Sequence, residues 1–209
     1  MIKVCIADNY PVVHFGVKSY FKDNAEISLV ANVGNFLMVR DILQTKEIDV
    51  LILDLELEGL ASIFEVKALL KNFPKTKIII FSGLSEQIYA PNAIKAGVSG
   101  FVHKSEKLET LGQSIIKVHQ GKIIMNETVK KNLALIAKQS KSERLYRKLS
   151  NREVEVLRYL SDGKKNHEIA DILKLNEKTI STYKLRLLTK LNVTNLGDLV
   201  NKAKTLEIV

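Results

Sequence analysis

The sequence predicts an α/β protein with a doubly wound, five-stranded parallel sheet, followed by a smaller helical domain. Short runs that are apolar throughout alternate with amphipathic helical patterns over residues 2–119. This alternation is typical of strands that helices cover on both faces of a sheet. Beyond residue 125 the strand-like runs stop, and short helical patterns rich in basic residues follow. The length of 209 residues suits two small domains.

The individual elements follow from hydrophobic periodicity and from the glycines that interrupt it. The expected strands are residues 2–7, 27–33, 49–53, 77–81 and 99–102. The expected helices are residues 11–21, 35–43, 62–73, 86–96 and 106–119, and Gly97 and Gly121 stop the last two. On the first helix, four apolar residues are expected to face the core: Val12, Val13, Val17 and Phe21.

Four polar residues stand at or just past the carboxyl ends of four expected strands: Asp8, Asp54, Ser82 and Lys104. Ligands of doubly wound sheets bind at this edge, at the point between the first and third strands where Asp8 and Asp54 stand. Two neighbouring carboxylates repel each other unless a cation joins them, and Mg²⁺ needs only one or two carboxylates. A carboxylate beside Mg²⁺ can accept a phosphoryl group, whose oxygens a lysine and a hydroxyl would hold.

Each of these side chains alone has an ordinary structural explanation. Asp8 could cap the helix that follows it, and Asp54 could be a solvated strand end. Ser82 suits a turn, and Lys104 suits the surface. Four such residues at four strand ends are difficult to explain as turns, so we expect them to form one site.

Residues 149–191 have the pattern of a helix-turn-helix. A first helix runs to Leu160, and a second begins near Asn166. A tight connection at residues 174–176 leads into a third helix, which Glu177 opens. One side of this third helix is apolar: Ile180, Leu187, Leu188 and Leu191. Bases and hydroxyls occupy the rest of its surface, which suits the major groove of DNA, whereas an isolated stretch of this kind could also be an amphipathic bundle with a solvated basic face.

The positive charge of the chain is concentrated in its C-terminal part. The net charge is +9, and residues 126–209 contain 18 Lys and Arg against 10 Asp and Glu. Residues 1–125 contain 14 against 13. An excess of positive charge on a small helical domain favours a polyanionic partner and salt-sensitive binding, so double-stranded DNA is the expected partner.

The sequence gives no indication of export or of membrane insertion. No apolar run is long enough to cross a membrane, and the N-terminal MIKVCIAD lacks the pattern of a signal peptide. The single cysteine, Cys5, cannot form an internal disulfide and is expected as a buried thiol within a strand. We therefore expect a cytoplasmic protein without membrane contact.

The C-terminal run resembles the DNA-binding domain of LuxR-type regulators. The matching motifs are Leu149-Ser150-x-Arg152-Glu153, Asn166-x-Glu168-Ile169-Ala170, Glu177-Lys178-Thr179-Ile180 and Lys190-Leu191-x-Val193. Residues 1 to about 120 resemble the receiver domain of bacterial response regulators, through the four strand-end residues and the motif ILDLELEG. The whole chain is similar to the NarL/FixJ family, which implies a receiver fold and a four-helix DNA-binding domain that dimerises on inverted half-sites.

This resemblance implies a receiver domain over residues 1–121, a linker over 122–145 and a LuxR-type helix-turn-helix domain over 146–209. Residues 126–148 contain neither proline nor glycine. Val129, Leu133 and Ile136 recur at helical spacing, which predicts a linker helix that runs into a flexible, charged segment.

The resemblance also implies roles for individual receiver residues. Asp54 matches the phosphoryl acceptor. Three residues match the groups that respond to or stabilise the phosphoryl group: the switch hydroxyl Ser82, the aromatic Phe101, which turns inward on activation, and Lys104. Mg²⁺ is the implied cofactor, and its implied ligands are Asp8, Asn9, Asp54 and the backbone carbonyl of Glu56.

In the DNA-binding domain, the resemblance places three side chains toward base edges: Ser181, Thr182 and Leu185. It places seven against phosphates: Lys164, Lys165, Lys178, Thr179, Tyr183, Arg186 and Lys190. Packing in the core is the alternative for Leu185, although its position opposite the apolar side of the helix favours exposure.

Asn9 departs from the family, in which the second member of the acidic pair is also an acid. The amide oxygen can still coordinate a cation, but one negative charge is missing. A charge at about 4 Å is worth roughly 1–4 kcal/mol, depending on the dielectric. Since about 1.4 kcal/mol corresponds to a factor of ten, the affinity for Mg²⁺ is expected to be weaker by about tenfold or more.

The sequence therefore predicts a DNA-binding transcription factor that a sensor histidine kinase controls by phosphorylating Asp54. A homodimer is expected, RNA polymerase is a further possible partner, and no enzymatic turnover is expected. One alternative, favoured by Asn9, is a receiver that regulates transcription without phosphorylation. Another is a Mg²⁺-dependent phosphatase that uses Asp54 and Glu56, but such folds carry their acidic motif after the first strand, and the helix-turn-helix would be unexplained.

Overall fold

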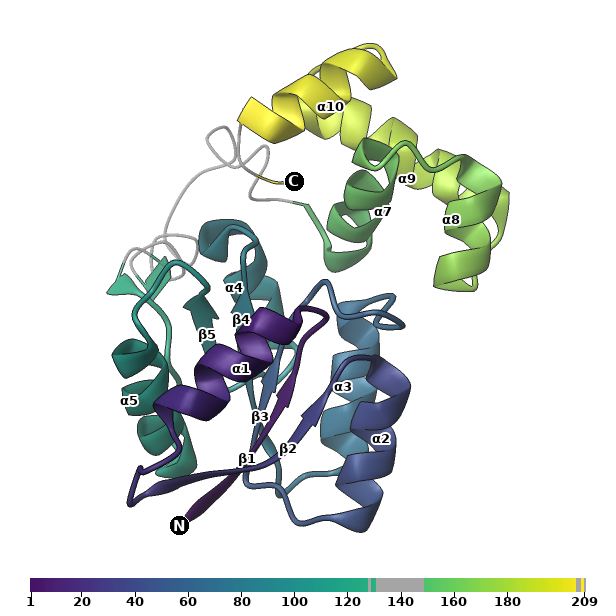
Figure 1. The fold of residues 1–209 in the computed structure, drawn as a ribbon. Helices are drawn as coiled ribbons and strands as arrows, with labels where there is room; N and C mark the ends of the chain where they lie inside the picture. Colours follow the sequence, from purple (N-terminus) through teal and green to yellow (C-terminus); the bar gives the residue numbers. More distant parts are fainter. Residues whose placement is uncertain (128, 131–148, 206–207, 209) are drawn as a thin grey trace. The chain divides into compact units, whose positions relative to one another are not determined.

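The computed structural model describes residues 1–127, 129–130, 149–205 and 208. They form two compact units, Met1–Lys131 and Asn132–Val209. The first unit contains a parallel sheet with its helices, and the second contains the C-terminal helices (Figure 1). Among the described residues, no helix combines the length and the apolar character that a membrane crossing requires.

The sheet of the first unit has five parallel strands: β1 Ile2–Ala7, β2 Ile27–Val33, β3 Val50–Leu53, β4 Lys77–Ser82 and β5 Gly100–His103. Their order across the sheet is β2-β1-β3-β4-β5. The connections change direction between β1 and β3, as in a doubly wound sheet. The predicted fold class and all five predicted strands are confirmed, with ends that agree or differ by one residue.

Five helices cover the two faces of this sheet: α1 Pro11–Tyr20, α2 Phe36–Thr45, α3 Ile63–Asn72, α4 Glu86–Lys95 and α5 Leu108–His119. The helices α1 and α5 lie on one face, and α2 and α3 lie on the other (Figure 1). Alternate strand side chains point to opposite faces, so Val4 and Ile6 pack with α1 and α5. Cys5, between them, is fully buried, as predicted, and burial raises the pKa of its thiol to about 12.

The prediction that Val12 faces the core is wrong. Its side chain is 74% exposed, whereas Val17 and Phe21 are buried and Val13 is partly buried. The three inward residues are spaced four apart and form one helical stripe, and Val12 lies about 100° away from that stripe. An apolar side chain is therefore left on the surface of α1.

The chain continues along the sheet after α5. Ile124 accepts a hydrogen bond of 3.0 Å from the backbone N–H of Phe101 and donates one of 2.9 Å to the carbonyl of Ser99. It thereby forms an isolated parallel bridge with Gly100 on β5. Val129, part of the predicted linker helix, is helical and buried. Leu133 and Ile136, the other residues of that prediction, lie outside the described residues.

The second unit has four helices among its described residues: α7 Asn151–Ser161, α8 Asn166–Leu173, α9 Glu177–Leu191 and α10 Leu196–Thr205. Ser150 and Glu153 form a capping box at the start of α7. The turn between α8 and α9 uses Lys174 in the left-handed conformation, with φ 53°, and Asn176 caps α9. These helices confirm the helix-turn-helix and the four-helix domain that the family resemblance implies.

Candidate functional site

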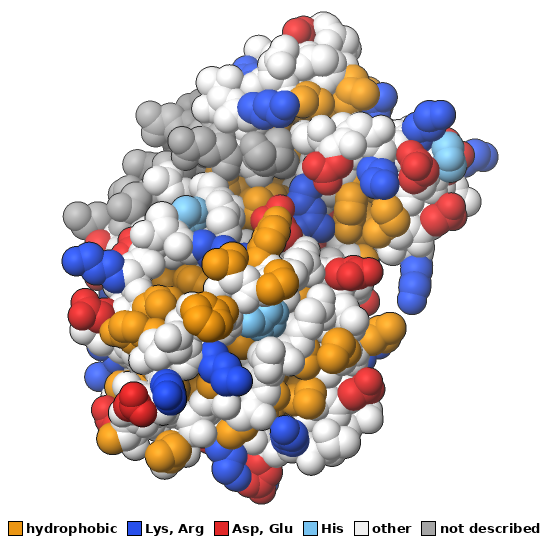
Figure 2. Space-filling model, viewed as in Figure 1, with side chains coloured by type: hydrophobic (Ala, Val, Ile, Leu, Met, Phe, Trp, Pro, Cys, Tyr) orange, Lys and Arg blue, Asp and Glu red, His pale blue; other side chains and the backbone are white. Residues whose placement is uncertain are grey.

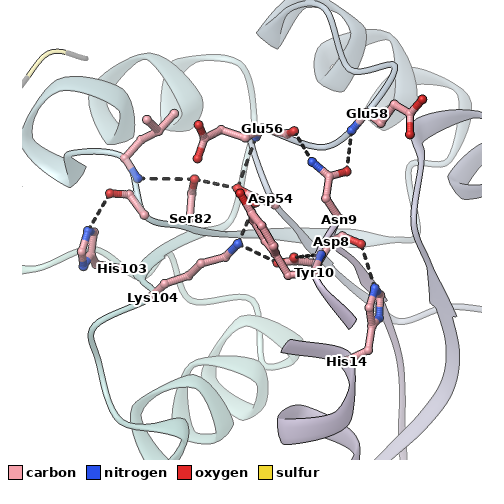
Figure 3. Close-up of polar contacts among 12 residues, drawn as sticks. Asp8, Asn9, Tyr10, His14, Asp54, Glu56, Glu58, Ser82, His103 and Lys104 are labelled. Carbon is pink, nitrogen blue, oxygen red and sulfur yellow. Dashed lines mark hydrogen bonds and ion pairs between the residues drawn. The ribbon is translucent and has the colours of Figure 1, made fainter. Parts of the chain in front are cut away.

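The register of the sheet brings the four predicted strand-end residues into one cluster (Figure 3). Ala7 is paired with Leu53, which places the next residues, Asp8 and Asp54, side by side. Ser82 is paired with His103 on β5, and Lys104 follows directly. Parallel strands end at the same edge of a sheet, so four separate strand ends contribute one side chain each.

Lys104 joins the two carboxylates of this cluster. Its Nζ lies 2.7 Å from Oδ2 of Asp8 and 2.7 Å from Oδ2 of Asp54. Both aspartates are 1% exposed, so their mutual repulsion is poorly screened without the ammonium group. Burial alone would lower the pKa of Lys104, but the hydrogen bonds and the charges of Asp54 and Asp8 outweigh it, and the pKa is raised.

The second oxygen of Asp54 is also held. Ser82 donates a hydrogen bond of 2.7 Å from its hydroxyl to Oδ1 of Asp54, and the backbone N–H of Glu56 donates one of 3.2 Å to the same oxygen. Asp8 accepts a hydrogen bond of 2.8 Å from the backbone N–H of Tyr10. The carboxylate of Asp54 is therefore fixed between a hydroxyl and an ammonium group.

Asn9 does not point into this cluster as a free ligand. Its side-chain N–H donates to the backbone carbonyl of Glu56 at 2.6 Å, and its Oδ1 accepts from the backbone N–H of Glu58 at 2.8 Å (Figure 3). Both polar atoms of the amide thus bind the loop between β3 and α3. The Glu56 carbonyl, expected from the resemblance to bind metal, is the acceptor of one of these bonds.

The oxygen atoms at this edge suit a hard cation. Two buried carboxylates, Asp8 and Asp54, and the carbonyl of Glu56 come from neighbouring loops. Within the described part of the chain, no three His, Cys, Asp or Glu side chains gather into a metal-binding group. A small oxygen donor set completed by water is what Mg²⁺ accepts.

Sequence reasoning did not single out His103, which links two loops of the site. Its Nε2 lies 3.0 Å from the carbonyl oxygen of Gly83, and its Nδ1 lies 2.6 Å from the hydroxyl of Ser105. Its place directly before Lys104, at the end of β5, is the signal that could have drawn attention to it. Phe101, on the same strand, is buried with 2% exposure.

The second unit presents an exposed stripe along α9 that is polar except for Leu185. Its residues recur at spacings of three or four: Lys178, Ser181, Thr182, Leu185, Arg186 and Thr189. Leu185 is 65% exposed, so the core-packing alternative for this residue is excluded. Lys164 and Lys165 are exposed between α7 and α8, and Figure 2 shows Lys and Arg side chains on the surface of these helices, with acidic side chains between them.

Three of the residues expected at phosphates are less accessible. Thr179 and Tyr183 are partly buried, and the guanidinium of Arg186 lies 5.9 Å from the centre of the Tyr183 ring. Lys190 forms an ion pair of 2.7 Å with the buried carboxylate of Glu153. Burial acts to raise the pKa of Glu153, but the hydrogen bonds from Lys190 and Ser150 outweigh it, and the pKa is lowered.

Two family models match the chain, one over each of its two units. Residues 4–116 match the family model of the response regulator receiver domain, and residues 147–203 match that of bacterial regulatory proteins of the luxR family. The chain belongs to the NarL/FixJ family of response regulators. As a response regulator with a LuxR-type domain, it is a DNA-binding transcription regulator.

Relatives that match over nearly their whole length support the assignment of this chain to the response regulators. The Fimbriae Z protein of Salmonella typhimurium is 33% identical over 207 residues, which cover 99% of this chain and 98% of that protein. BvgA of Bordetella pertussis, named as a putative positive transcription regulator of virulence factors, is 31% identical over 205 residues. These cover 97% of this chain and 96% of that protein. The structure of RcsB from Salmonella enterica serovar Typhimurium, bound to a promoter in the presence of phosphomimetic BeF3−, has a TM-score of 0.81, with 26% identity and 98% coverage of both chains.

Proposed function

We propose that a sensor histidine kinase phosphorylates Asp54 of this response regulator and thereby controls its sequence-specific binding to DNA. The observation that carries this proposal is the pair of contacts on Asp54, whose two oxygens bind Ser82 and Lys104 at 2.7 Å each. These two groups are the ones that a phosphoryl group on Asp54 would need, because its oxygens accept hydrogen bonds and carry negative charge.

The transfer step uses the residues of this cluster in distinct roles. An oxygen of Asp54 forms a bond to the phosphorus atom, and the bond between phosphorus and the histidine nitrogen of the kinase breaks. Lys104 and Ser82 hold the transferred oxygens. Asp8, Asp54 and the Glu56 carbonyl would hold Mg²⁺, which neutralises charge on the phosphoryl oxygens.

The switch follows from a change of contacts. Ser82 and Lys104 bind the carboxylate in the structure, and they would bind phosphoryl oxygens after transfer. Only such a difference between the two states can shift a conformational equilibrium. Since Ser82 ends β4 and Lys104 follows β5, the shift acts on the loops after these strands. Phe101, within β5, is the proposed aromatic switch.

In the DNA-binding domain, Ser181, Thr182 and Leu185 are proposed to face base edges. The exposed cations beside them are proposed to contact phosphates: Lys164, Lys165, Lys178 and Arg186. RcsB has been solved as two dimers bound to two parallel DNAs, and by this likeness we propose that the chain binds DNA as a homodimer. RNA polymerase is the proposed partner at the promoter.

An apolar surface on α1 supports docking of a protein phosphodonor. Tyr10, Val12 and Phe15 are 55%, 74% and 74% exposed, and the ring of Tyr10 lies 5.2 Å from the Lys104 ammonium. Exposed apolar patches of this kind mark protein contacts, and this one borders the Asp54 cluster. The kinase and the DNA meet in the cytoplasm, where we place the protein.

The test is the transfer of one phosphoryl group from acetyl phosphate, followed by intact mass over a range of Mg²⁺ concentrations. The wild-type chain is expected to gain a single phosphoryl group, and Asp54→Ala is expected to gain none. Asp41→Ala, which removes an exposed acid on α2, is the matched control and should be labelled normally. Equal labelling of Asp54→Ala would contradict the assignment of the acceptor.

A second candidate function is a receiver that regulates transcription without phosphorylation. It is favoured by the hydrogen bond that the side-chain amide of Asn9 donates to the Glu56 carbonyl, which is one of the oxygens expected to bind Mg²⁺. A chain that remains unlabelled at high Mg²⁺ and still binds DNA would support this candidate over the first.

A further inference from the structure

A bidentate contact links the start of α4 to the segment that leaves the receiver. The two carboxylate oxygens of Glu86, the first residue of α4, accept hydrogen bonds of 2.9 Å from the backbone N–H of Asn126 and 2.8 Å from its side-chain amide. We call this contact the Glu86–Asn126 clamp. Its partners are 40 residues apart in the sequence, and hydrogen bonds to a carboxylate are stronger than neutral ones.

Asn126 also begins the helical turn that follows. Its Oδ1 accepts a hydrogen bond of 2.8 Å from the N–H of Val129, and its backbone carbonyl accepts one of 3.0 Å from Lys130. One residue thus holds α4 with its amide N–H groups and starts the next turn with its oxygens. In the sequence, this turn precedes the unit that binds DNA.

Both attachments of this exit segment lie on elements that adjoin the Asp54 cluster. Ile124 is bonded to the backbone of β5, the strand that ends at His103 before Lys104. Glu86 stands four residues after Ser82, and Ser82 accepts a hydrogen bond of 3.5 Å from the N–H of Leu84 in the intervening loop. Ser82 and Glu86 therefore stand at the two ends of one short loop, so a displacement of Ser82 would act on the loop that ends at Glu86.

One partner of the clamp is partly removed from water, whereas Asn126 is exposed. Glu86 is half-buried, and burial raises the pKa of its carboxyl, against the effect of the two donors of Asn126. A half-buried carboxylate that loses its donors is left poorly solvated, so the contact resists partial opening.

We propose that the Glu86–Asn126 clamp is the positioning contact that transmits the state of Asp54 to the chain segment entering the DNA-binding domain. This inference rests on the proposed function, because it requires that phosphorylation alters DNA binding. A purely local role, in which Asn126 only caps the helical turn through its bonds to Val129 and Lys130, is the competing explanation.

Two variants of the full-length chain separate these roles. Asn126→Asp keeps an oxygen for the N–H of Val129, so the cap remains, but it replaces the amide donor with a carboxylate that faces Glu86. Adding Glu86→Gln supplies an amide that can donate to Asp at position 126, while its oxygen can still accept from the backbone N–H. The single variant removes the side-chain bond of the clamp and sets two carboxylates against each other. The double variant restores that bond with donor and acceptor exchanged, and the backbone bond is available in both.

Three quantities are measured for each chain, with and without acetyl phosphate and Mg²⁺. They are the phosphoryl mass increase, the hydrogen exchange of residues 122–130, and the affinity for a duplex selected from a random pool by labelled wild-type protein. Allosteric couplings are typically about 5- to 150-fold. Asn126→Asp is expected to label normally, to lose protection over this segment and to lower the DNA response by about threefold or more, and the double variant should recover the response.

The failures are distinguishable. A wild-type chain that is not labelled, or that shows no DNA response, overturns the proposed function and this inference with it. A labelled Asn126→Asp chain with a full DNA response overturns the inference alone. Unchanged protection of residues 122–130 in Asn126→Asp would also overturn it, because the clamp would not then restrain the segment.

Discussion

The side chain of Asn9 is bonded to the backbone of Glu56 in the loop after β3. The amide N–H donates a hydrogen bond of 2.6 Å to the Glu56 carbonyl, and the amide oxygen accepts one of 2.8 Å from the N–H of Glu58. A carboxylate at position 9 could accept the second bond but could not donate the first. Asn9 therefore links the loop after β1 to the loop after β3 without needing a metal ion. Relative to an acid at this position, asparagine adds a hydrogen bond between the loops and removes a negative charge that would attract Mg²⁺.

The variant Asn9→Asp should be less stable without metal and should bind Mg²⁺ more tightly. It removes a neutral hydrogen bond worth about 1 kcal/mol and adds a negative charge beside Asp8 and Asp54. We expect the metal-free chain to melt about 4 °C lower and to bind Mg²⁺ about tenfold more tightly. Thermal unfolding with EDTA and over a Mg²⁺ titration measures both effects.

Asn201→Asp, the same charge change on exposed α10, is the control for Asn9→Asp. It should alter neither the metal-free melting temperature of the receiver nor the affinity for Mg²⁺. If Asn9→Asp were as stable as wild type without metal, the tie between the loops would contribute nothing.

Lys104→Met should destabilise the metal-free receiver. Two aspartates of 1% exposure would lose the cation that joins them, and the loss of one partner from a buried ion pair costs about 3 kcal/mol. Because Mg²⁺ can replace the missing charge, the metal should restore part of the stability. Urea unfolding with and without Mg²⁺ gives both values, and Lys107→Met, an exposed neighbour, should behave as wild type.

Lys178 and Lys190 should differ in how they affect DNA binding. Removal of a phosphate contact lowers the slope of log affinity against log salt by about one for each bound chain, so Lys178→Ala should reduce the slope. Lys190→Ala should leave the slope unchanged and destabilise the domain by at least about 1 kcal/mol, because it leaves Glu153 buried without its ammonium partner. Filter binding over a range of salt, with thermal unfolding in parallel, distinguishes the two. A reduced slope of log affinity against log salt in Lys190→Ala would indicate that Lys190 contacts a phosphate after all.

The same ion pair predicts an acid limit for the DNA-binding domain. The pKa of Glu153 is lowered from 4.5, so its ionised form is favoured in the folded state. The stability that it contributes is complete above pH 4.5 and is lost as the pH falls through the lowered pKa. Urea unfolding at pH 7, 4.5 and 3 should show this decline, and Glu153→Gln should flatten it. An equally steep decline in Glu153→Gln would assign the acid sensitivity to other groups.

Features that depend on local periodicity could be predicted from the sequence. The five strands follow from apolar runs, and the Asp54 cluster follows from the polar residues that end them, because parallel strands finish at one edge. Leu185 could be placed outside the core because it lies opposite the apolar side of its helix. These arguments need only the spacing of residues within one element and the topology of the sheet.

Contacts between side chains far apart in the sequence could not be predicted in this way. Lys190 looks like one more cation of a basic helix, and only packing shows that Glu153, 37 residues away, takes its charge. The bond from Asn9 to the Glu56 carbonyl and the path of Ile124 along β5 depend on loop conformations that periodicity does not encode. The assignment of Val12 failed for a related reason, because an apolar residue at the start of a helix can belong to the surface.

Control of DNA binding by Asp54 is tested most directly by the DNA affinity of the same chain with and without a phosphoryl group on this residue. The labelled and unlabelled proteins would be titrated against one duplex selected from a random pool, with Asp54→Ala treated identically. Labelled wild-type protein should bind the duplex more tightly than unlabelled protein, and treatment of Asp54→Ala should leave its affinity unchanged. Equal affinity of the labelled and unlabelled wild-type chains would contradict this control, and would leave a receiver that does not switch DNA binding.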